Sequence, residues 1–198
     1  MVRIANETVY NEALGILESE VIAIINELTL KVFVCHDQEL VNSIIDDIEK
    51  YQTPNCILQV VPRNLIVSER HVKLAAYLTF RAFEKERNIS RKKYMEMLLY
   101  LFGERQIGKV IEKMRRFGRS PYLVIVACRG VANEITEILR RNNLMLEHYC
   151  SKLKSRMGED PLEANIDINA VRNVFEICGT DDIVKAVLCK VSSLILQA

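Results

Sequence analysis

Apolar and polar residues follow two different periods along the chain, and these periods predict its elements. Runs that are β-branched or alternate residue by residue are typical of strands, and spacings of three and four are typical of amphipathic helices. The segments expected to form strands are 30–35, 56–61, 65–67, 122–128, 144–149 and a short stretch near Ile166. The segments expected to form helices are 7–28, 38–51, 69–87, 90–102, 106–117, 131–142, 169–178 and 181–197.

Residues that commonly cap helices stand at several of these boundaries. Asp37, Ser68 and Ser90 stand where an N-cap side chain would accept a backbone hydrogen bond. Gly103 and Gly118 stand where helices are expected to end. Because strands and helices interleave without a repeat, we expect an α+β protein with a central mixed β-sheet of four to five strands covered by helices.

The composition is that of an ordinary globular domain. The chain has 198 residues, of which 49% are hydrophobic and 27% are charged, so a disordered or low-complexity protein is excluded. The longest strongly apolar stretches, such as 21–25 and 123–128, are far shorter than the roughly 20 residues of a membrane span. Residues 1–17 lack the continuous apolar core of a secretory signal, and we therefore expect a cytoplasmic protein without membrane contact.

The six cysteines are scattered, and no two of them form a C-x-x-C pair. Because most lie within apolar strand or helix patterns, we interpret them as buried thiols. Cys35 beside His36, and Cys150 near His148, are isolated pairs rather than the clusters that hold a metal. We therefore expect no metal site and no cofactor.

The net charge of +1 averages over three unlike segments. Residues 1–68 carry a net charge of −6, residues 69–119 carry +8, and residues 120–198 carry −1. Within the basic segment, the helix expected at 106–117 has a cationic side and an apolar side. The cationic side and its flank hold Arg105, Lys109, Lys113 and Arg116, and the apolar side holds Ile107, Val110, Ile111 and Met114.

Arg91, Lys92 and Lys93 add three positive charges at the start of the preceding helix, where they oppose the helix dipole. A phosphate-binding surface would explain this concentration of charge. A solvated face with surface pairs, such as Glu112 with Arg116, would explain it equally well. The residues alone leave both interpretations open.

Residues 103–110 read GERQIGKV, which partly matches the G-x-x-x-x-G-K-[ST] loop of nucleotide hydrolases. Val110 stands where the magnesium-binding hydroxyl belongs, and the preceding residues predict a helix rather than the required strand. The three histidines lie in separate elements, without a nucleophile turn near any of them. The residues therefore assemble no recognisable catalytic set, and we expect no small-molecule substrate.

Three parts of the chain resemble one protein family. They read NLIVSERHVKLAAYLTFRAF, SRKKYMEMLLYLFGERQIGKVIEKM with the strand YLVIVAC, and NAVRNVFEICGTDDIVKAVLCKVSSL. These parts resemble the small kinase-associated subunits of the KEOPS complex in their archaeal form, the family of the human PRPK-binding protein, TPRKB. The family's G-x-R-Q-I signature between two helices is matched by Gly103, Arg105, Gln106 and Ile107.

The resemblance covers residues 57–198 well and residues 30–56 loosely. It implies one domain of this family at 30–198, preceded by an N-terminal extension at 1–29 that the periodicity predicts to be helical. Phe102 and Val110 depart from the family's usual residues, which are a small hydroxyl residue and Ala. These two departures concern local packing beside the signature.

The resemblance implies a non-catalytic KEOPS subunit that binds the small atypical kinase/ATPase of the complex. The complex installs the threonylcarbamoyl group on the tRNA adenosine next to the anticodon, and archaeal relatives of this subunit help to recruit tRNA by its 3′ CCA end. The family's role implies Arg105 as the main tRNA contact and Gln106 as a hydrogen-bonding partner, with Gly103 and Ile107 structural. From charge alone, the further expected tRNA contacts are Lys92, Lys93, Lys109 and Lys113.

The last helix is apolar on more than one face, which indicates either deep burial or contact with a partner. For a subunit of a stable assembly we favour the partner. The residues expected to contact the kinase are Val184, Val187, Leu188, Val191 and Ile195. Ile107, Ile111 and Met114 are instead expected to lie in the core.

Two functions from other classes stand as alternatives. One is a nucleic-acid-binding regulator, unrelated to KEOPS, that uses the basic helices at 90–119. The other is a divergent nucleotide hydrolase that uses Gly103 to Lys109.

Overall fold

The computed structural model describes residues 28–130, 133–141, 146–153, 162 and 166–196. Most of the helix expected at 7–28 lies outside these residues, whereas Leu28 and Thr29 already belong to the first strand. The strands are β1 (Leu28–Cys35), β2 (Cys56–Pro62), β3 (Tyr122–Arg129) and β4 (Ser151–Lys152). The helices are α2 (Gln38–Asp46), α3 (Glu69–Glu84), α4 (Lys93–Phe102), α5 (Ile107–Phe117), α6 (Asn133–Arg141), α7 (Leu146–Tyr149), α8 (Ile168–Phe175) and α9 (Ile183–Leu196), with 3₁₀ turns η1 (Ile48–Tyr51) and η2 (Arg63–Leu65).

The sheet has the strand order β2-β3-β1-β4. Its long pairings place Val32 opposite Ile125 and Val60 opposite Val124, and every pairing among the described residues is antiparallel. The expectation of a mixed sheet is therefore wrong, because β3 inserts between β1 and β2 and runs against both. Four to five strands were expected. The described sheet has three long strands and, at its edge, the two-residue strand β4.

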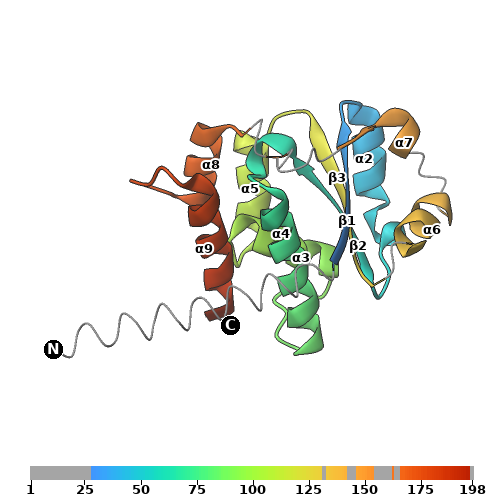
Figure 1. Ribbon diagram of the computed structural model, residues 1–198, viewed down its shortest axis with the longest axis horizontal. Helices are drawn as coiled ribbons and strands as arrows, with labels where there is room; N and C mark the ends of the chain where they lie inside the picture. The colour runs from blue at the N-terminus through green and yellow to red at the C-terminus, as the bar shows by residue number, and fades with distance from the viewer. Residues whose placement is uncertain (1–27, 131–132, 142–145, 154–161, 163–165, 197–198) are drawn as a thin grey trace.

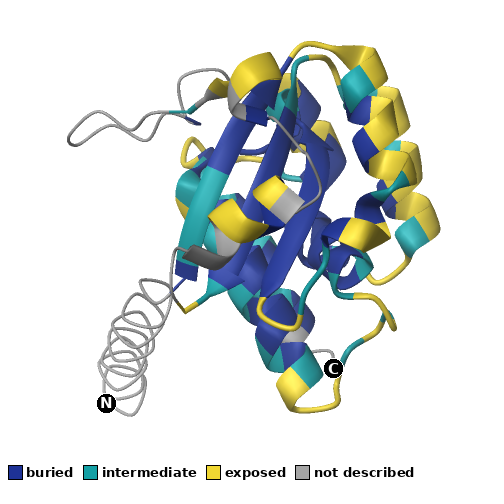
Figure 2. Ribbon diagram, turned by 90° about the vertical axis from the view of Figure 1, so that its right-hand side faces the viewer, coloured by how far each residue is buried: buried dark blue, intermediate teal, exposed yellow. Residues whose placement is uncertain are grey.

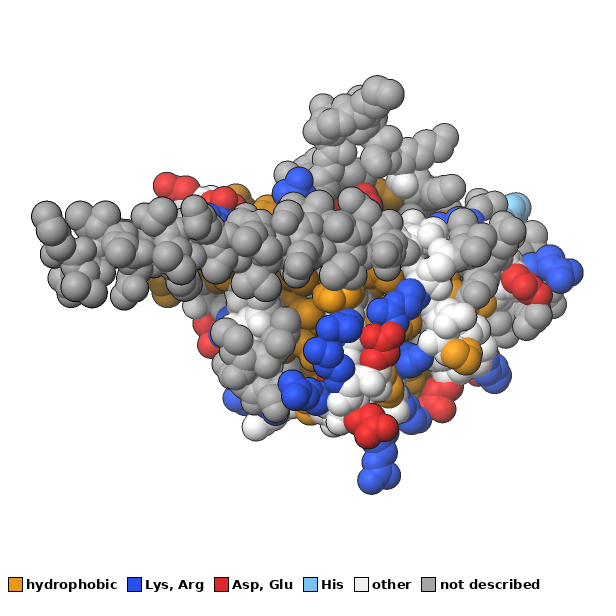
Figure 3. Space-filling model, turned by 60° about the horizontal axis from the view of Figure 1, so that its bottom comes forward, with side chains coloured by type: hydrophobic (Ala, Val, Ile, Leu, Met, Phe, Trp, Pro, Cys, Tyr) orange, Lys and Arg blue, Asp and Glu red, His pale blue; other side chains and the backbone are white. Residues whose placement is uncertain are grey.

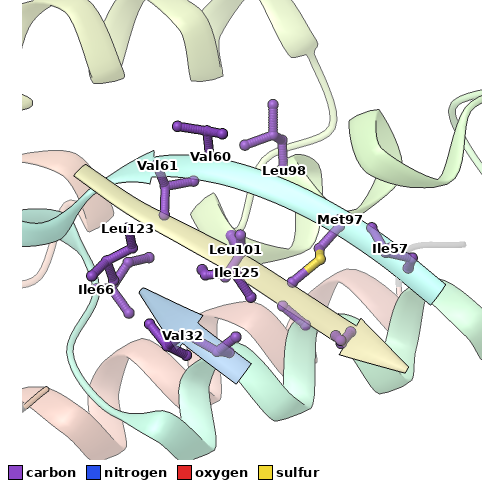
Figure 4. Close-up of a cluster of buried hydrophobic side chains, with 14 of the residues drawn as sticks. Val32, Ile57, Val60, Val61, Ile66, Met97, Leu98, Leu101, Leu123 and Ile125 are labelled. Carbon is purple, nitrogen blue, oxygen red and sulfur yellow. The ribbon is translucent and has the colours of Figure 1, made fainter. Parts of the chain in front are cut away.

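Helices cover both faces of the sheet, which confirms an α+β protein (Figure 1). Helices α2, α6 and α7 lie on one side, and α3, α4, α5, α8 and α9 lie on the other. Burial on both faces explains why all seven residues of β2 are buried (Figure 2). The one polar residue among them, Gln59, donates a hydrogen bond from its amide to the Tyr94 carbonyl. In the core, Met97, Leu98 and Leu101 of α4 pack beside the sheet residues (Figure 4).

Several helix boundaries follow from the expected caps. The Asp37 carboxylate accepts hydrogen bonds from the backbone N–H groups of Glu39 and Leu40, and Ser68 Oγ accepts one from His71. Helix α4, in contrast, begins at Lys93 rather than at Ser90. The buried Glu96 carboxylate accepts the N–H groups of Ile89 and Ser90, so these donors are satisfied without helix formation.

Three of the shorter strands were predicted wrongly. Residues 63–65 form a turn of 3₁₀ helix, and residues 66–68 have no regular structure. Residues 146–149, the described part of the segment expected at 144–149, form helix α7. Ile166 lies in no strand.

The prediction of six buried thiols is also wrong. Cys35 is bonded to Cys150, and Cys56 is bonded to Cys128, the residue opposite it on β3. The other two cysteines, at 178 and 189, are free and exposed. Among the described residues, no helix is long and apolar enough to cross a membrane.

Candidate functional site

An open depression of about 320 Å³ lies where the end of α4 and the start of α5 meet α8 and α9. Its lining is mostly charged or polar. The lining residues are Gly103, Glu104, Arg105, Gln106, Lys109, Glu176, Lys190, Ser193 and Leu194. The signature residues found in the sequence thus meet two elements that lie more than 60 residues further along the chain.

Gly103 allows the chain to turn at this point. It ends α4 with a left-handed φ of 61°, a conformation that glycine adopts without steric cost. A Cβ at this position would lie 2.8 Å from Cγ of Lys190, so the absence of a side chain also permits close contact with α9. At Gly103 the chain therefore combines a left-handed helix end with close packing against α9.

The next two signature residues, Arg105 and Gln106, lie at the molecular surface. Arg105 and Gln106 are exposed, and the Gln106 carbonyl accepts the backbone N–H groups of Lys109 and Val110 at the start of α5. The Lys109 side chain is exposed and lines the same depression. Among the described residues it has no ion pair or hydrogen bond. The structure thus brings Arg105, Gln106 and Lys109 together.

Lys113 lies beside this group, but its ammonium is already paired with acidic side chains. Its ammonium forms an ion pair with Glu104 and lies 3.5 Å from Oε1 of Glu176, and only 14% of its side chain is exposed. Lys190 of α9 lies 3.7 Å from Oε2 of the same Glu176. These two lysines hold the pKa of the Glu176 carboxyl below its ordinary value, with Lys113 having the larger effect.

Lys92 and Lys93 lie at the opposite end of α4, about 15 Å away along a helix of this length. Lys92 is paired with Glu49, which raises the pKa of its ammonium. Lys93 donates to the carbonyl of Pro54 and lies 5.6 Å from the Phe80 ring, and burial lowers its pKa. The structure does not bring these two lysines together with Arg105.

Figure 3 shows that positive and negative side chains are also mixed over a larger part of the surface. Where it is not covered, Lys and Arg side chains lie among Asp and Glu side chains rather than in one continuous basic surface. The ion pairs show the same mixing of charges: Glu84, for example, pairs with Arg129, which lowers the pKa of its carboxyl group. Part of the positive charge in residues 69–119 is paired with acidic residues from elsewhere in the fold, as Lys92 is with Glu49 and Lys113 is with Glu176.

The apolar side of α5 only partly confirms the prediction. Val110 is completely buried, and Ile107 and Met114 are partly buried against the core. Ile111, in contrast, is 53% exposed, so its expected place in the core is wrong. Phe102 is buried and stacks on Phe175 with ring centroids 6.2 Å apart, and it is therefore a packing residue rather than part of the depression.

The residues of α9 that were expected to contact the kinase fall into two groups. Val187 and Val191 are completely buried within this chain, so as core residues they offer no surface to a partner. Val184 and Leu188 are half-buried and lie one turn apart. The side chain of Ile195 lies outside the described residues. Among the members of the expected set whose side chains are described, only Val184 and Leu188 are accessible.

The nucleotide-hydrolase alternative is contradicted by the local fold. A phosphate-binding loop of that type joins a strand to a helix, whereas residues 103–106 join helix α4 to helix α5. Lys109 belongs to α5 rather than to the loop. Among the described residues, no group of three or more His, Cys, Asp or Glu side chains is arranged to hold a metal ion.

Sequence reasoning missed five residues of the depression: Glu104, Glu176, Lys190, Ser193 and Leu194. Glu104 is next to the signature and could have been found by proximity. The other four lie in α9 or directly after α8, and no local pattern marks them as site residues. Their place beside Arg105 follows only from the packing of α8 and α9 against α4 and α5.

The fold and the site together have the features of a binding protein, with an exposed polar depression and a half-exposed apolar stripe on the last helix. The chain matches the family described as kinase binding protein CGI-121 over residues 34–194. Because this match covers most of the chain, the protein belongs to the CGI-121 family, and the resemblance seen in the sequence is confirmed. No curated protein matches the chain at a significant level.

Proposed function

We propose that this protein is a non-catalytic KEOPS subunit that binds the small atypical kinase/ATPase of the complex and recruits tRNA by its 3′ CCA end. The complex would then modify the adenosine next to the anticodon. The family match carries the kinase-binding part of this proposal. The tRNA part rests on the exposed cationic groups of Arg105 and Lys109 at one depression.

The depression has the chemistry that a single-stranded RNA end requires. Guanidinium and ammonium groups neutralise backbone phosphates, and a planar guanidinium can also stack on an unpaired base. Gln106 offers an amide that can both donate and accept hydrogen bonds at a base edge. A pocket of about 320 Å³ is too small for a duplex but has room for a nucleotide.

The tRNA part is tested with Arg105→Glu and with tRNA that lacks its 3′ CCA end. We expect Arg105→Glu to weaken tRNA binding by about 10-fold at moderate salt, because it replaces a phosphate-binding cation by an anion. Removal of CCA should weaken binding to the unmodified protein by a similar factor. Fluorescence anisotropy measures both, with Arg70→Glu on α3 as a control of equal charge change. Equal affinity of Arg105→Glu and the control would contradict the proposed site.

The kinase surface is proposed at Val184 and Leu188, the accessible members of the apolar set on α9. A half-buried apolar pair at a helix surface gains free energy when a partner removes the remaining exposed area from water. Leu188→Asp should therefore abolish co-purification with the kinase and leave the protein folded. The regulator without KEOPS is the alternative, and it predicts no kinase co-purification with any variant.

Val191→Asp is the matched comparison, because it places the same charge on the buried side of the same helix. Burying an unpaired carboxylate is strongly unfavourable, so this variant should lose its cooperative thermal unfolding. The proposed surface fails if Leu188→Asp retains full kinase binding, or if it unfolds as Val191→Asp does.

A further inference from the structure

Glu176 lies between two lysines at the edge of the depression. Its Oε1 is 3.5 Å from the ammonium of Lys113, and its Oε2 is 3.7 Å from the ammonium of Lys190. Both lysines come from other helices, α5 and α9, so the fold rather than the local sequence brings the three charges together. A carboxylate between two ammonium groups occupies a place where an anionic ligand could bind.

The lysines are fixed more firmly than the carboxylate. Side-chain exposure is 14% for Lys113 and 34% for Lys190, whereas it is 65% for Glu176. Lys113 has a second partner in Glu104, which is itself only 14% exposed. The two contacts of Glu176 are near the outer limit for an ion pair, and exposed pairs of this kind are weak. Glu176 can therefore swing out while the two ammonium groups stay in place.

The backbone at Glu176 supports a specific role for this side chain. Its φ of 56° lies in the left-handed region, and the residue stands at the C-terminal end of α8, where glycine is the usual choice. A side chain is unfavourable in this conformation. Glycine would suit the helix end better but would remove the carboxylate from the two lysines.

We propose that Glu176 is a built-in counter-ion of the RNA site, whose carboxylate stands in for a backbone phosphate between Lys113 and Lys190 and must be displaced when single-stranded RNA binds. This inference rests on the proposed function of the same depression. It assigns Lys113 and Lys190 to the phosphate site and makes Glu176 a residue that lowers the affinity for RNA. Displacement keeps binding reversible, as is appropriate for a subunit that must release each tRNA.

The test measures tRNA affinity of the full chain by fluorescence anisotropy, with Glu176→Gln. We expect binding about 5-fold tighter near 0.1 M salt, and a steeper salt dependence of the binding constant, by about 0.7 for each additional phosphate that the protein neutralises. Glu39→Gln, an exposed change of equal charge on α2 across the sheet, should leave both quantities unchanged. The double variant Glu176→Gln/Lys190→Gln should lose most of the increase in affinity that Glu176→Gln shows over the unmodified protein.

Glu176→Gly is a second variant that removes the carboxylate while relieving the left-handed backbone. It should also bind tRNA more tightly, with a raised melting temperature that shows an intact fold. Equal affinities for Glu176→Gln, Glu39→Gln and the unmodified protein would overturn the inference, as would an undiminished increase in affinity with tRNA that lacks CCA. If Arg105→Glu weakens binding while Glu176→Gln has no effect, only this inference fails. If Arg105→Glu has no effect, the proposed site itself fails.

Discussion

The two ends of helix α4 differ in how their basic residues are used. Lys92 and Lys93 lie at its N-terminal end, and Gly103 and Arg105 follow its C-terminal end. The sequence places basic residues at both ends. At the first end, Lys92 is paired with Glu49 and Lys93 with the Pro54 carbonyl. At the second end, Arg105 lines an open depression. A count of charges cannot distinguish a cation that is paired within the fold, such as Lys92, from one that lines an open depression, such as Arg105.

The two ends also differ in how they are supported from within. A buried carboxylate, Glu96, organises the loop before the helix. A buried imidazole, His71, supports the last turn through a contact of 2.8 Å between its Nε2 and the carbonyl oxygen of Leu101. Because a carbonyl can only accept, Nε2 carries the proton. We therefore expect changes at the two ends to affect different properties.

The largest expected effect is the loss of stability at low pH that is caused by His71, the residue that supports the C-terminal end of α4. Burial lowers the pKa of His71 from about 6.5 to about 4. Between these two pH values the imidazole is protonated in the unfolded chain but neutral in the folded chain. The free energy of unfolding should therefore fall as the pH falls from about 6.5 towards 4, by up to about 3 kcal/mol. Urea denaturation at several pH values measures this. In His71→Gln this contribution to the pH dependence should be absent.

The next effect concerns the N-terminal end. Glu96→Ala removes the acceptor of two backbone N–H groups, and we expect a loss of about 2 kcal/mol in the free energy of unfolding. Amide hydrogen exchange at Ile89 and Ser90 should become faster. Glu96→Gln, which keeps one acceptor oxygen and the same size, should lose less. Unchanged exchange in Glu96→Ala would contradict this role of Glu96.

Helix α4 illustrates what the sequence can predict and where it fails. Its existence as a helix and its end at Gly103 follow from local features, and both were predicted correctly. Its burial on nearly all sides, which includes Met97, Tyr100 and Leu101, was not predicted. Its start was misplaced by three residues, because Ser90 resembles an N-cap. The side chain that decides the matter is Glu96, whose burial depends on the surrounding fold. A boundary set by a buried polar group cannot be read from capping residues alone.

The cysteines and the sheet show the same limit at longer range. Cys56 and Cys128 lie 72 residues apart, and only the antiparallel pairing of β2 with β3 makes them neighbours. The site follows this pattern. Arg105 and Gln106 were found from a local signature, whereas Lys190 and Glu176 come to the depression through the packing of α8 and α9. Helical spacing placed Lys113 on the cationic side of its helix, but it could not show that Lys113 forms an ion pair with Glu104.

A smaller effect is expected from a methyl group at the C-terminal end. Gly103→Ala adds a Cβ at a left-handed residue and 2.8 Å from Cγ of Lys190. We expect a loss of about 1 kcal/mol in stability, because the backbone is strained while the flexible lysine can move aside. The displaced Lys190 should weaken tRNA binding by about 3-fold. Gly108→Ala on α5, where a Cβ has no neighbour within 4 Å, should leave tRNA binding unchanged.

The smallest effect should come from Lys92, and it tests the comparison most directly. Lys92 lies at the N-terminal end of α4, about 15 Å along the helix from the depression, and its ammonium is paired with Glu49. Lys92→Gln should therefore change tRNA affinity by less than about 2-fold, whereas Lys109→Gln, which removes one charge from the depression, should weaken it by about 3-fold. Anisotropy titrations at one salt concentration compare the two. A larger loss for Lys92→Gln than for Lys109→Gln would move the RNA surface to the other end of α4.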